Sequence, residues 1–161
     1  MIGILSDSHD NVPAVRLAAA LFRDAGCSLV IHAGDFVAPF TARELQAAGC
    51  PVRAVYGNCD GEKAGLRDAL APFGEIRPAP LAFAWDGLEI VVVHIGGDLA
   101  RRAARRGRRL IVHGHTHKPE IRALGEALIV NPGETGGWLT GRRTAALYDP
   151  DTGTAEIVAL A

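Results

Sequence analysis

The sequence has few cysteines, almost no net charge and no long apolar run. Its three cysteines, Cys27, Cys50 and Cys59, lack the spacing of a zinc finger, and no signal-like segment precedes the first apolar run. These absences predict a cytoplasmic protein in a reducing compartment. A formal net charge of -1 provides no field that would collect nucleic acid or an anionic membrane. The apolar runs are far shorter than the roughly 20 residues of a membrane span, so we expect a soluble protein.

Short β-rich runs alternate with helical patterns, which predicts an α/β fold in one domain spanning residues 1–161. The predicted strands are Met1–Leu5, Leu29–Ala33, Val52–Tyr56, Leu88–Val93 and Leu110–Val112. The first predicted helix begins after Asn11 and ends at Gly26. Three further helices are predicted over Ala42–Ala48, Glu62–Leu70 and Asp98–Arg106. From Pro119 onward the pattern predicts an antiparallel tail, with strands near Leu128–Val130, Thr144–Tyr148 and Glu156–Leu160.

Polar residues that can bind metal ions follow each of the first five predicted strands. They are Asp7, His9, Asp35, Asn58, His94, His115 and His117. Because the carboxyl ends of strands in an open α/β sheet meet at one crevice, we expect these side chains to lie together. Carboxylate, imidazole and amide oxygen are ligands for hard-to-borderline divalent ions, and this set is large enough for two ions that share one carboxylate.

Each cluster also has a purely structural interpretation. Asp7 could cap the first helix, Asp35 and Asn58 suit turns, and His94 could be a satisfied core histidine. The pair in Gly114-His115-Thr116-His117 is the strongest signal, because two imidazoles directly follow a buried strand. Other motifs fail, since the chain has no Walker-type loop, no His-Glu-x-x-His helix and no serine nucleophile elbow.

Five motifs in this order resemble those of the calcineurin-like metallophosphoesterases, and the small size resembles the YfcE-type phosphodiesterase branch. The motifs are Asp7-Ser8-His9, Gly34-Asp35, Gly57-Asn58-Cys59-Asp60, His94 and Gly114-His115-Thr116-His117. The resemblance runs from Ser6 to Asn131-Pro132-Gly133. It implies two facing mixed β-sheets flanked by helices, in a four-layer α/β/β/α fold.

The resemblance also implies a division of the ligands between two metal ions. Asp7, His9, Asp35 and His117 would hold one ion, and Asp35, Asn58, His94 and His115 the other. Two divalent ions about 3.5–4 Å apart would lower the pKa of a shared water enough to supply hydroxide for in-line attack on phosphorus. Manganese suits the mixed ligands first, with iron, zinc, nickel and cobalt admissible. Protonation of the ligands should weaken binding below a pH of about 6.5.

The candidate catalytic residues besides the ligands lie in the Gly57-Asn58-Cys59-Asp60 motif, in which Asn58 is also a ligand. Asp60 is expected to orient a ligand imidazole, the alternative being an ordinary turn carboxylate. Cys59 stands where many relatives carry a histidine that protonates the leaving group, so we expect aryl diesters to react faster than alkyl monoesters. We expect Glu134 to lie in a surface turn rather than to face the pocket.

The remaining interpretations concern partners. The arginines at 101, 102, 105, 106, 108 and 109 fit a solvated helix face, with a phosphate clamp as the alternative, and no aromatic residues interleave with them. We expect a small phosphoester substrate and neither nucleic acid nor membrane as partner. A non-catalytic scaffold and a nuclease stay open as other functions, although filled ligand positions and the short chain argue against them. The sequence identifies no substrate-binding residues and leaves the oligomeric state open, a homodimer included.

Overall fold

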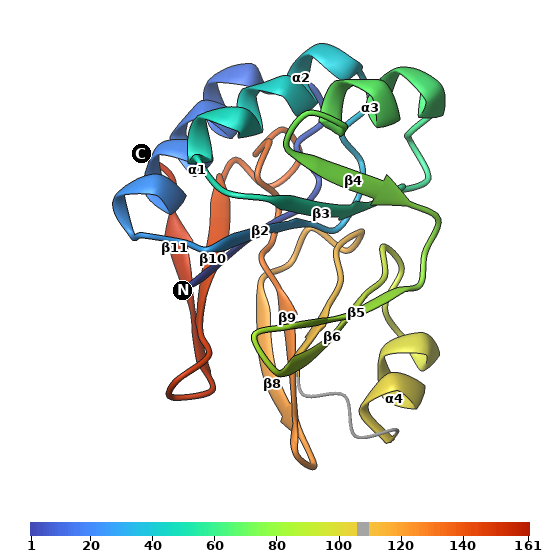
Figure 1. Cartoon of the computed structure of the whole chain (residues 1–161), viewed down its shortest axis with the longest axis vertical. Coiled ribbons are helices and arrows are strands. Elements are labelled where there is room, and N and C mark those ends of the chain that lie inside the picture. Colours follow the sequence, from blue (N-terminus) through green and yellow to red (C-terminus); the bar gives the residue numbers. More distant parts are fainter. Residues whose placement is uncertain (106–109) are drawn as a thin grey trace.

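The computed structural model describes residues 1–105 and 110–161 and contains two mixed β-sheets that face each other (Figure 1). The strands of the first sheet, sheet A, are β1 (Ile2–Leu5), β2 (Leu29–His32), β3 (Val52–Val55), β4 (Gly74–Arg77), β10 (Thr144–Asp149) and β11 (Thr154–Ala159). They lie in the order β11-β10-β1-β2-β3-β4. The pairs from β1 to β4 are parallel, whereas β10 and β11 pair antiparallel.

The second sheet, sheet B, is built from the later strands of the chain. Its strands are β5 (Leu81–Trp85), β6 (Leu88–Val92), β7 (Leu110–Val112), β8 (Glu120–Leu124) and β9 (Ala127–Asn131). They lie in the order β5-β6-β7-β9-β8. The central strands β6, β7 and β9 are parallel, and the two edge strands pair antiparallel with their neighbours.

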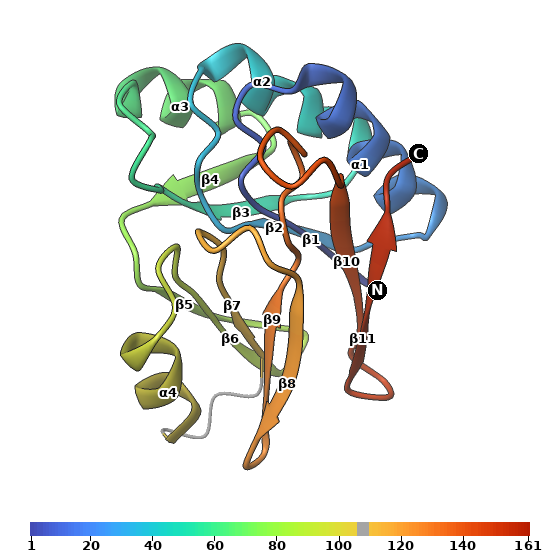
Figure 2. The same cartoon turned by 180° about the vertical axis from the view of Figure 1, so that it is seen from behind.

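Helices cover the outer faces of both sheets, as the views from the front and from behind show (Figures 1 and 2). Sheet A carries α1 (Val12–Asp24), α2 (Pro39–Arg43), the 3-10 helix η1 (Glu44–Ala48) and α3 (Lys63–Leu70). The helix α4 (Asp98–Arg105) packs against β7 and β9 of sheet B. The expected four-layer α/β/β/α arrangement in a single domain is therefore confirmed.

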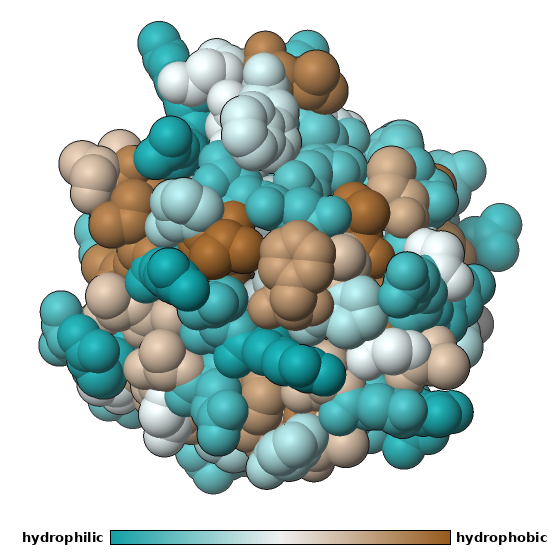
Figure 3. Space-filling view, turned by 90° about the horizontal axis from the view of Figure 1, so that it is seen from above, coloured by the Kyte–Doolittle hydropathy of each residue, from teal (hydrophilic) through white to brown (hydrophobic). Residues whose placement is uncertain are grey.

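The helix α1 shows how local sequence produces this arrangement. The Asn11 side chain accepts a hydrogen bond from the Ala14 N–H, at 3.2 Å, which satisfies an otherwise free donor of the first turn. Val15 and Phe22 are buried on one face, and Gly26 follows the end of the helix with a φ of 65°. Seen from above, the molecule shows mainly hydrophilic side chains with apolar groups scattered among them (Figure 3), as expected for helices that bury only one face.

Among the described residues, two of the three apolar cores join sheet A to its helices and to sheet B, and the third lies between α4 and sheet B. The first lies between sheet A and its helices and includes Phe22, Leu45 and Leu66. The second includes Ile4 and Ile31 of sheet A and Ile90, Leu110 and Val112 of sheet B, and so joins the two sheets. Full burial of one such side chain contributes about 1.5–3 kcal/mol. These cores fix the strands whose carboxyl ends carry the candidate ligands.

Several predicted elements need correction. The helix expected over Ala42–Ala48 is instead α2 followed by η1, and Gly49 ends this segment with a φ of 74°. The strands β4, β5 and β8 were not predicted. The tail is not wholly antiparallel, because β9 also pairs parallel with β7. The fourth predicted helix is confirmed to Arg105, and its last predicted residue, Arg106, lies outside the described residues.

All three cysteines are free thiols in the structure. Within residues 1–105 and 110–161, no helix has both the length and the apolar character needed to cross a membrane.

Candidate metal centre

The predicted ligands meet at one place although they come from two sheets. Asp7 and His9 follow β1, Asp35 follows β2 and Asn58 follows β3, whereas His94 follows β6 and His115 and His117 follow β7. A cavity of about 410 Å³ is lined by His9, Asp35, Asn58, Cys59, His115 and His117. A larger cavity of about 690 Å³ shares only His117 with this set, so the chemistry belongs to the smaller one.

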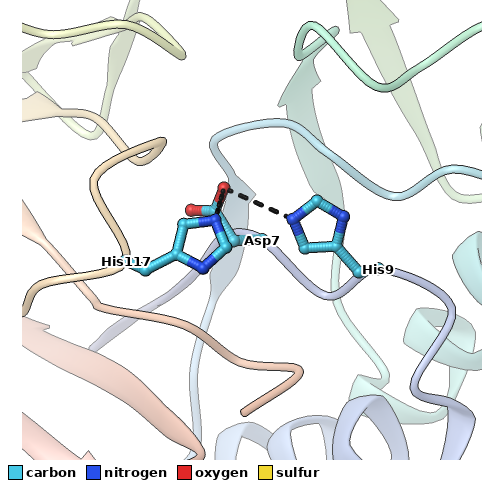
Figure 4. A group of neighbouring side chains, drawn as sticks. All are labelled: Asp7, His9 and His117. Atoms are coloured by element: carbon cyan, nitrogen blue, oxygen red, sulfur yellow. Dashed lines mark ion pairs between the residues drawn. The ribbon is translucent and has the colours of Figure 1, made fainter. Parts of the chain in front are cut away.

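The first group of ligands surrounds the carboxylate of Asp7, which is fully buried. The Asp7 Oδ1 atom lies 3.9 Å from His9 Nε2 and 3.4 Å from His117 Nε2. Both rings turn toward this carboxylate from different segments of the chain (Figure 4). The backbone N–H of His115 donates to Asp7 Oδ2 at 3.0 Å, which ties the histidine loop to the end of β1.

The second group surrounds Asp35. Its Oδ2 atom lies 3.3 Å from His94 Nε2 and 3.7 Å from His9 Nε2, so this carboxylate stands between the two groups. Its Oδ1 atom accepts a hydrogen bond from the Cys59 N–H at 2.8 Å. The His94 ring lies 5.2 Å from that of His115, measured between centroids. The structure thus brings all the candidate ligands into one neighbourhood.

The backbone of the site adopts a conformation that side chains rarely take. Positive φ angles occur at Asp7, His9, Asp35, His115 and His117, between 41° and 69°. Left-handed backbone at residues other than glycine is uncommon and clusters where function requires it. Gly34 and Gly57 have no room for a side chain, because a Cβ on Gly34 would meet Gly57 and one on Gly57 would meet Asp35. The strand ends therefore approach one another closely enough to gather the ligands.

The atoms that could bind a metal cannot all be satisfied by hydrogen bonds with one another. His94 Nδ1 lies 2.8 Å from the Ala33 carbonyl oxygen, to which it donates. The ring's other nitrogen, Nε2, then faces two further oxygens, at 3.3 Å from Asp35 and 3.0 Å from Asn58 Oδ1. A neutral imidazole has only one N–H, so this crowding of acceptors calls for a proton or a metal ion. His9 Nε2 is also buried with no hydrogen-bond partner among the described residues.

The two central carboxylates differ in their pKa values. Burial raises the pKa of Asp7, against a hydrogen bond from Ser6 and the charges of His94 and His117. Burial acts in the same direction on Asp35, but the His94 imidazole and the Cys59 N–H hold its pKa well below the usual range. Burial would lower the pKa of His94, and Asp35 raises it instead. A cation placed between these groups would offset the poorly compensated charge of Asp7.

Asp60 holds two loops together rather than orienting an imidazole. Its buried carboxylate accepts hydrogen bonds from the backbone N–H groups of Asp35 at 3.0 Å, Val37 at 2.8 Å and Gly57 at 2.7 Å. Val37, a β-branched residue, has a φ of 83°, which is strained backbone that these bonds help to hold. In place of the expected contact with a ligand ring, the carboxylate joins the segment from Asp35 to Val37 to Gly57 of the next loop.

The position of Glu134 was predicted wrongly from the sequence. It is not in a surface turn, because its residue is only 1% exposed and it borders the cavity. Its Oε1 atom lies 3.2 Å from His117 Nδ1, and the carboxylate accepts hydrogen bonds from Leu139 and Thr140. Burial alone would raise the pKa of Glu134, but these hydrogen bonds outweigh it and lower the pKa. The signal available was its place directly after β9, the same place that the ligands occupy after their own strands.

The other two histidines support the site from outside the cavity. His32 is buried, stacks on Phe36 at 3.4 Å between ring centroids, and lies 3.1 Å from the Ser8 hydroxyl. His113 lies 3.3 Å from the Asn131 side-chain nitrogen. Their rings pack the loops that carry Asp7 and His115.

The described part of the arginine cluster lies on α4. Arg101, Arg102 and Arg105 are exposed, and Arg101 pairs with Asp98 at 3.7 Å. Arg101 and Arg105 line a hollow next to the turn between β8 and β9, which contains none of the ligands. This placement favours the solvated helix face over the phosphate clamp. Arg106, Arg108 and Arg109 lie outside the described residues.

Comparison with known proteins agrees with this geometry. A phosphodiesterase from Methanocaldococcus jannaschii is 34% identical over 154 residues, which are 93% of each chain. The solved structure of an archaeal phosphodiesterase matches with a TM-score of 0.91 and 31% identity over 99% of both chains. YfcE, a phosphoesterase from E. coli, shares the fold with a TM-score of 0.69 and 21% identity, again over 99% of both chains.

A family model described as the calcineurin-like phosphoesterase superfamily domain matches residues 1–153. This match takes in every candidate ligand and nearly the whole length of the chain. The chain belongs to the calcineurin-like phosphoesterase superfamily.

Proposed function

We propose that this protein is a metal-dependent phosphodiesterase that hydrolyses small phosphoesters with two divalent cations. The observation that carries the proposal is the crowding of oxygens around His94 Nε2, together with the unpaired His9 Nε2, at a cavity between buried carboxylates. The similarity to archaeal phosphodiesterases supports the choice of diesters. Manganese is the first candidate metal, and iron, zinc, nickel and cobalt also suit these donors.

Two sets of residues would hold the cations. Asp7, His9, Asp35 and His117 form one set, and Asp35, Asn58, His94 and His115 form the other. When bound, the cations would polarise the phosphoryl oxygens and make a coordinated water acidic enough to serve as nucleophile near neutral pH. Asp35 belongs to both sets because its Oδ2 atom faces His9 and His94.

The protein's own contribution is to hold these groups before substrate arrives. Asp60 fixes the backbone of Asp35, and the Glu134 carboxylate lies 3.2 Å from His117 Nδ1, which has no hydrogen-bond partner among the described residues, while His117 Nε2 faces Asp7. Because these groups are already held in place, less entropy is lost on reaching the transition state. Cys59 is exposed at the rim, where a thiol is a weak proton donor to a departing alkoxide. Diesters with acidic aryl leaving groups should therefore react faster than alkyl monoesters.

The proposal is tested by assaying bis(4-nitrophenyl) phosphate with the manganese-loaded protein. The wild type should release 4-nitrophenol and bind two metal ions per chain, whereas His117→Ala should lose most of the activity and one ion. Arg122→Ala, an exposed change on β8, is the control and should behave as the wild type. Binding of manganese without turnover of any phosphoester would favour a scaffold, and cleavage of DNA in the same preparation would favour a nuclease.

A further inference from the structure

Two large apolar side chains stand exposed at the mouth of the metal centre. Trp138 is 64% exposed and Leu139 is 81% exposed, and both line the same cavity as His9, Asp35 and His117. Residues of this size are usually buried, since burial stabilises each by about 1.5–3 kcal/mol. Their exposure beside a ring of ionisable groups calls for an explanation that the proposed hydrolysis alone does not provide.

The position of the Trp138 indole is fixed although its surface is open. Its Nε1–H donates to the backbone carbonyl oxygen of His9 at 2.9 Å. This bond uses the polar edge of the indole and ties it to the segment that carries His9. The apolar surface of the ring is then left for another partner, because a hydrogen bond occupies an edge and not a face.

Hydrogen bonds hold the loop that carries Trp138 and Leu139. The Glu134 carboxylate accepts hydrogen bonds from the N–H groups of Leu139 at 3.0 Å and Thr140 at 2.8 Å. Gly137 has a φ of 67°, and Gly141 N–H donates to the Gly137 carbonyl oxygen at 3.2 Å, which closes a turn. The same carboxylate faces His117 at 3.2 Å. The apolar residues are therefore presented at a fixed distance from the ligands.

We infer that Trp138 and Leu139 form a subsite for a flat aromatic ester group of the substrate. The inference rests on the proposed function, because it takes the phosphoryl group to lie on the metal ligands. A phosphoester of this kind has an anionic centre and an apolar ring. The cavity offers a region for each, the metal ligands for the phosphoryl group and the apolar side chains for the ring. The occupant is thus a phosphodiester that carries an aromatic ring, rather than a diester of short alkyl groups.

Two probes with the same phosphinate group separate ring binding from metal binding. Diphenylphosphinate and dimethylphosphinate have equal charge and no ester bond to hydrolyse, and they differ only in phenyl against methyl. Calorimetric titration of the manganese-loaded protein gives the dissociation constant of each. We expect diphenylphosphinate to bind at least about tenfold more tightly, which corresponds to about 1.4 kcal/mol.

The variants test whether Trp138 and Leu139 cause this preference. Trp138→Ala should reduce the ratio of the two dissociation constants to about twofold or less, while Trp138→Phe, which keeps a ring, should retain most of it. Leu139→Ala should give an intermediate ratio. Trp85→Phe, on β5, is the control that leaves the ratio unchanged and also makes Trp138 the sole tryptophan. In that background diphenylphosphinate should change the tryptophan fluorescence and dimethylphosphinate should not.

The outcomes distinguish this inference from the function on which it rests. If Trp138→Ala weakens both probes equally, the residue acts only by positioning His9, and the subsite is refuted while the hydrolase stands. If the wild type binds both probes with equal affinity, the subsite is likewise refuted. If neither probe binds and no diester is hydrolysed, the proposed function and the subsite fall together.

Discussion

The two sheets contribute to the site in different ways. Sheet A supplies Asp7 and Asp35, whose carboxylates are buried and already accept hydrogen bonds from backbone N–H groups. Sheet B supplies His94, His115 and His117, and the rings of His94 and His117 each face more oxygen acceptors than a neutral imidazole can satisfy. The fold thus fixes the anionic part of the site without a metal, whereas we propose that cations complete the imidazole part. Changes on the two sides should therefore differ in kind.

The largest effect should come from the carboxylate that joins the two sides. Asp35→Asn keeps an oxygen for the Cys59 N–H but removes the charge that both proposed cations share. We expect turnover of bis(4-nitrophenyl) phosphate to fall on the order of 1000-fold, with loss of bound metal. Metal analysis alongside the assay checks this. Full activity with two ions retained would mean that Asp35 is not the shared ligand.

Asp60 tests whether the anionic side is held by the backbone. Asp60→Ala leaves the N–H groups of Asp35, Val37 and Gly57 without their acceptor. The free energy of unfolding of the metal-free protein should fall by about 3 kcal/mol, as measured by urea denaturation. Asp68→Ala, an exposed change on α3, is the matched control and should cost little. Equal stability of the two variants would contradict the role given to Asp60.

Glu134 tests the imidazole side. Glu134→Gln removes the charge that faces His117 Nδ1 but keeps an acceptor for Leu139 and Thr140. Metal affinity or turnover should fall about 10–100-fold, while the unfolding free energy without metal changes less than in Asp60→Ala. Glu126→Gln, exposed between β8 and β9, serves as control. A loss of stability with unchanged metal affinity would assign Glu134 to the anionic side instead.

The smallest expected effect is a difference in the reactivity of two thiols, Cys27 in the core next to sheet A and Cys59 at the cavity. Burial, helped by the nearby Cys50, raises the pKa of Cys27 to about 11, whereas Cys59 is exposed at the cavity. Because the thiolate is the reactive form, Cys27 should resist iodoacetamide at pH 8 and react faster only as the pH approaches 11. Mass spectrometry of the modified peptides checks this, and Cys27 reacting as fast as Cys59 at pH 8 would contradict it.

The sequence predicted the centre of each sheet better than its edges. The strands β1, β2, β3, β6 and β7 are largely apolar and are buried at every position except Arg53 and Glu89, and such runs are strong signals. The missed strands β4, β5 and β8 are all edge strands, with one neighbour and a mixed pattern of burial. β5 and β8 pair with the next strand in sequence across short turns, so their partners are not distant. All three missed strands have few fully buried residues, and strands without a buried face give a weak local signal.

The candidate site follows the same division. The ligands after central strands were predicted because their motifs stand next to strong strand signals, and the structure places them together. The roles of Asp60 and Glu134 depend on which backbone groups come within 3 Å of their oxygens, and only the folded loops decide that. Whether the predicted ligands bind metal stays a prediction that the geometry supports.

The most direct test of the proposed two-cation site is anomalous X-ray diffraction from a crystal of the manganese-loaded protein. Two anomalous peaks should appear, one among Asp7, His9 and His117 and the other among Asn58, His94 and His115, with Asp35 in contact with both. A single peak, or peaks away from Asp35, would contradict the proposal.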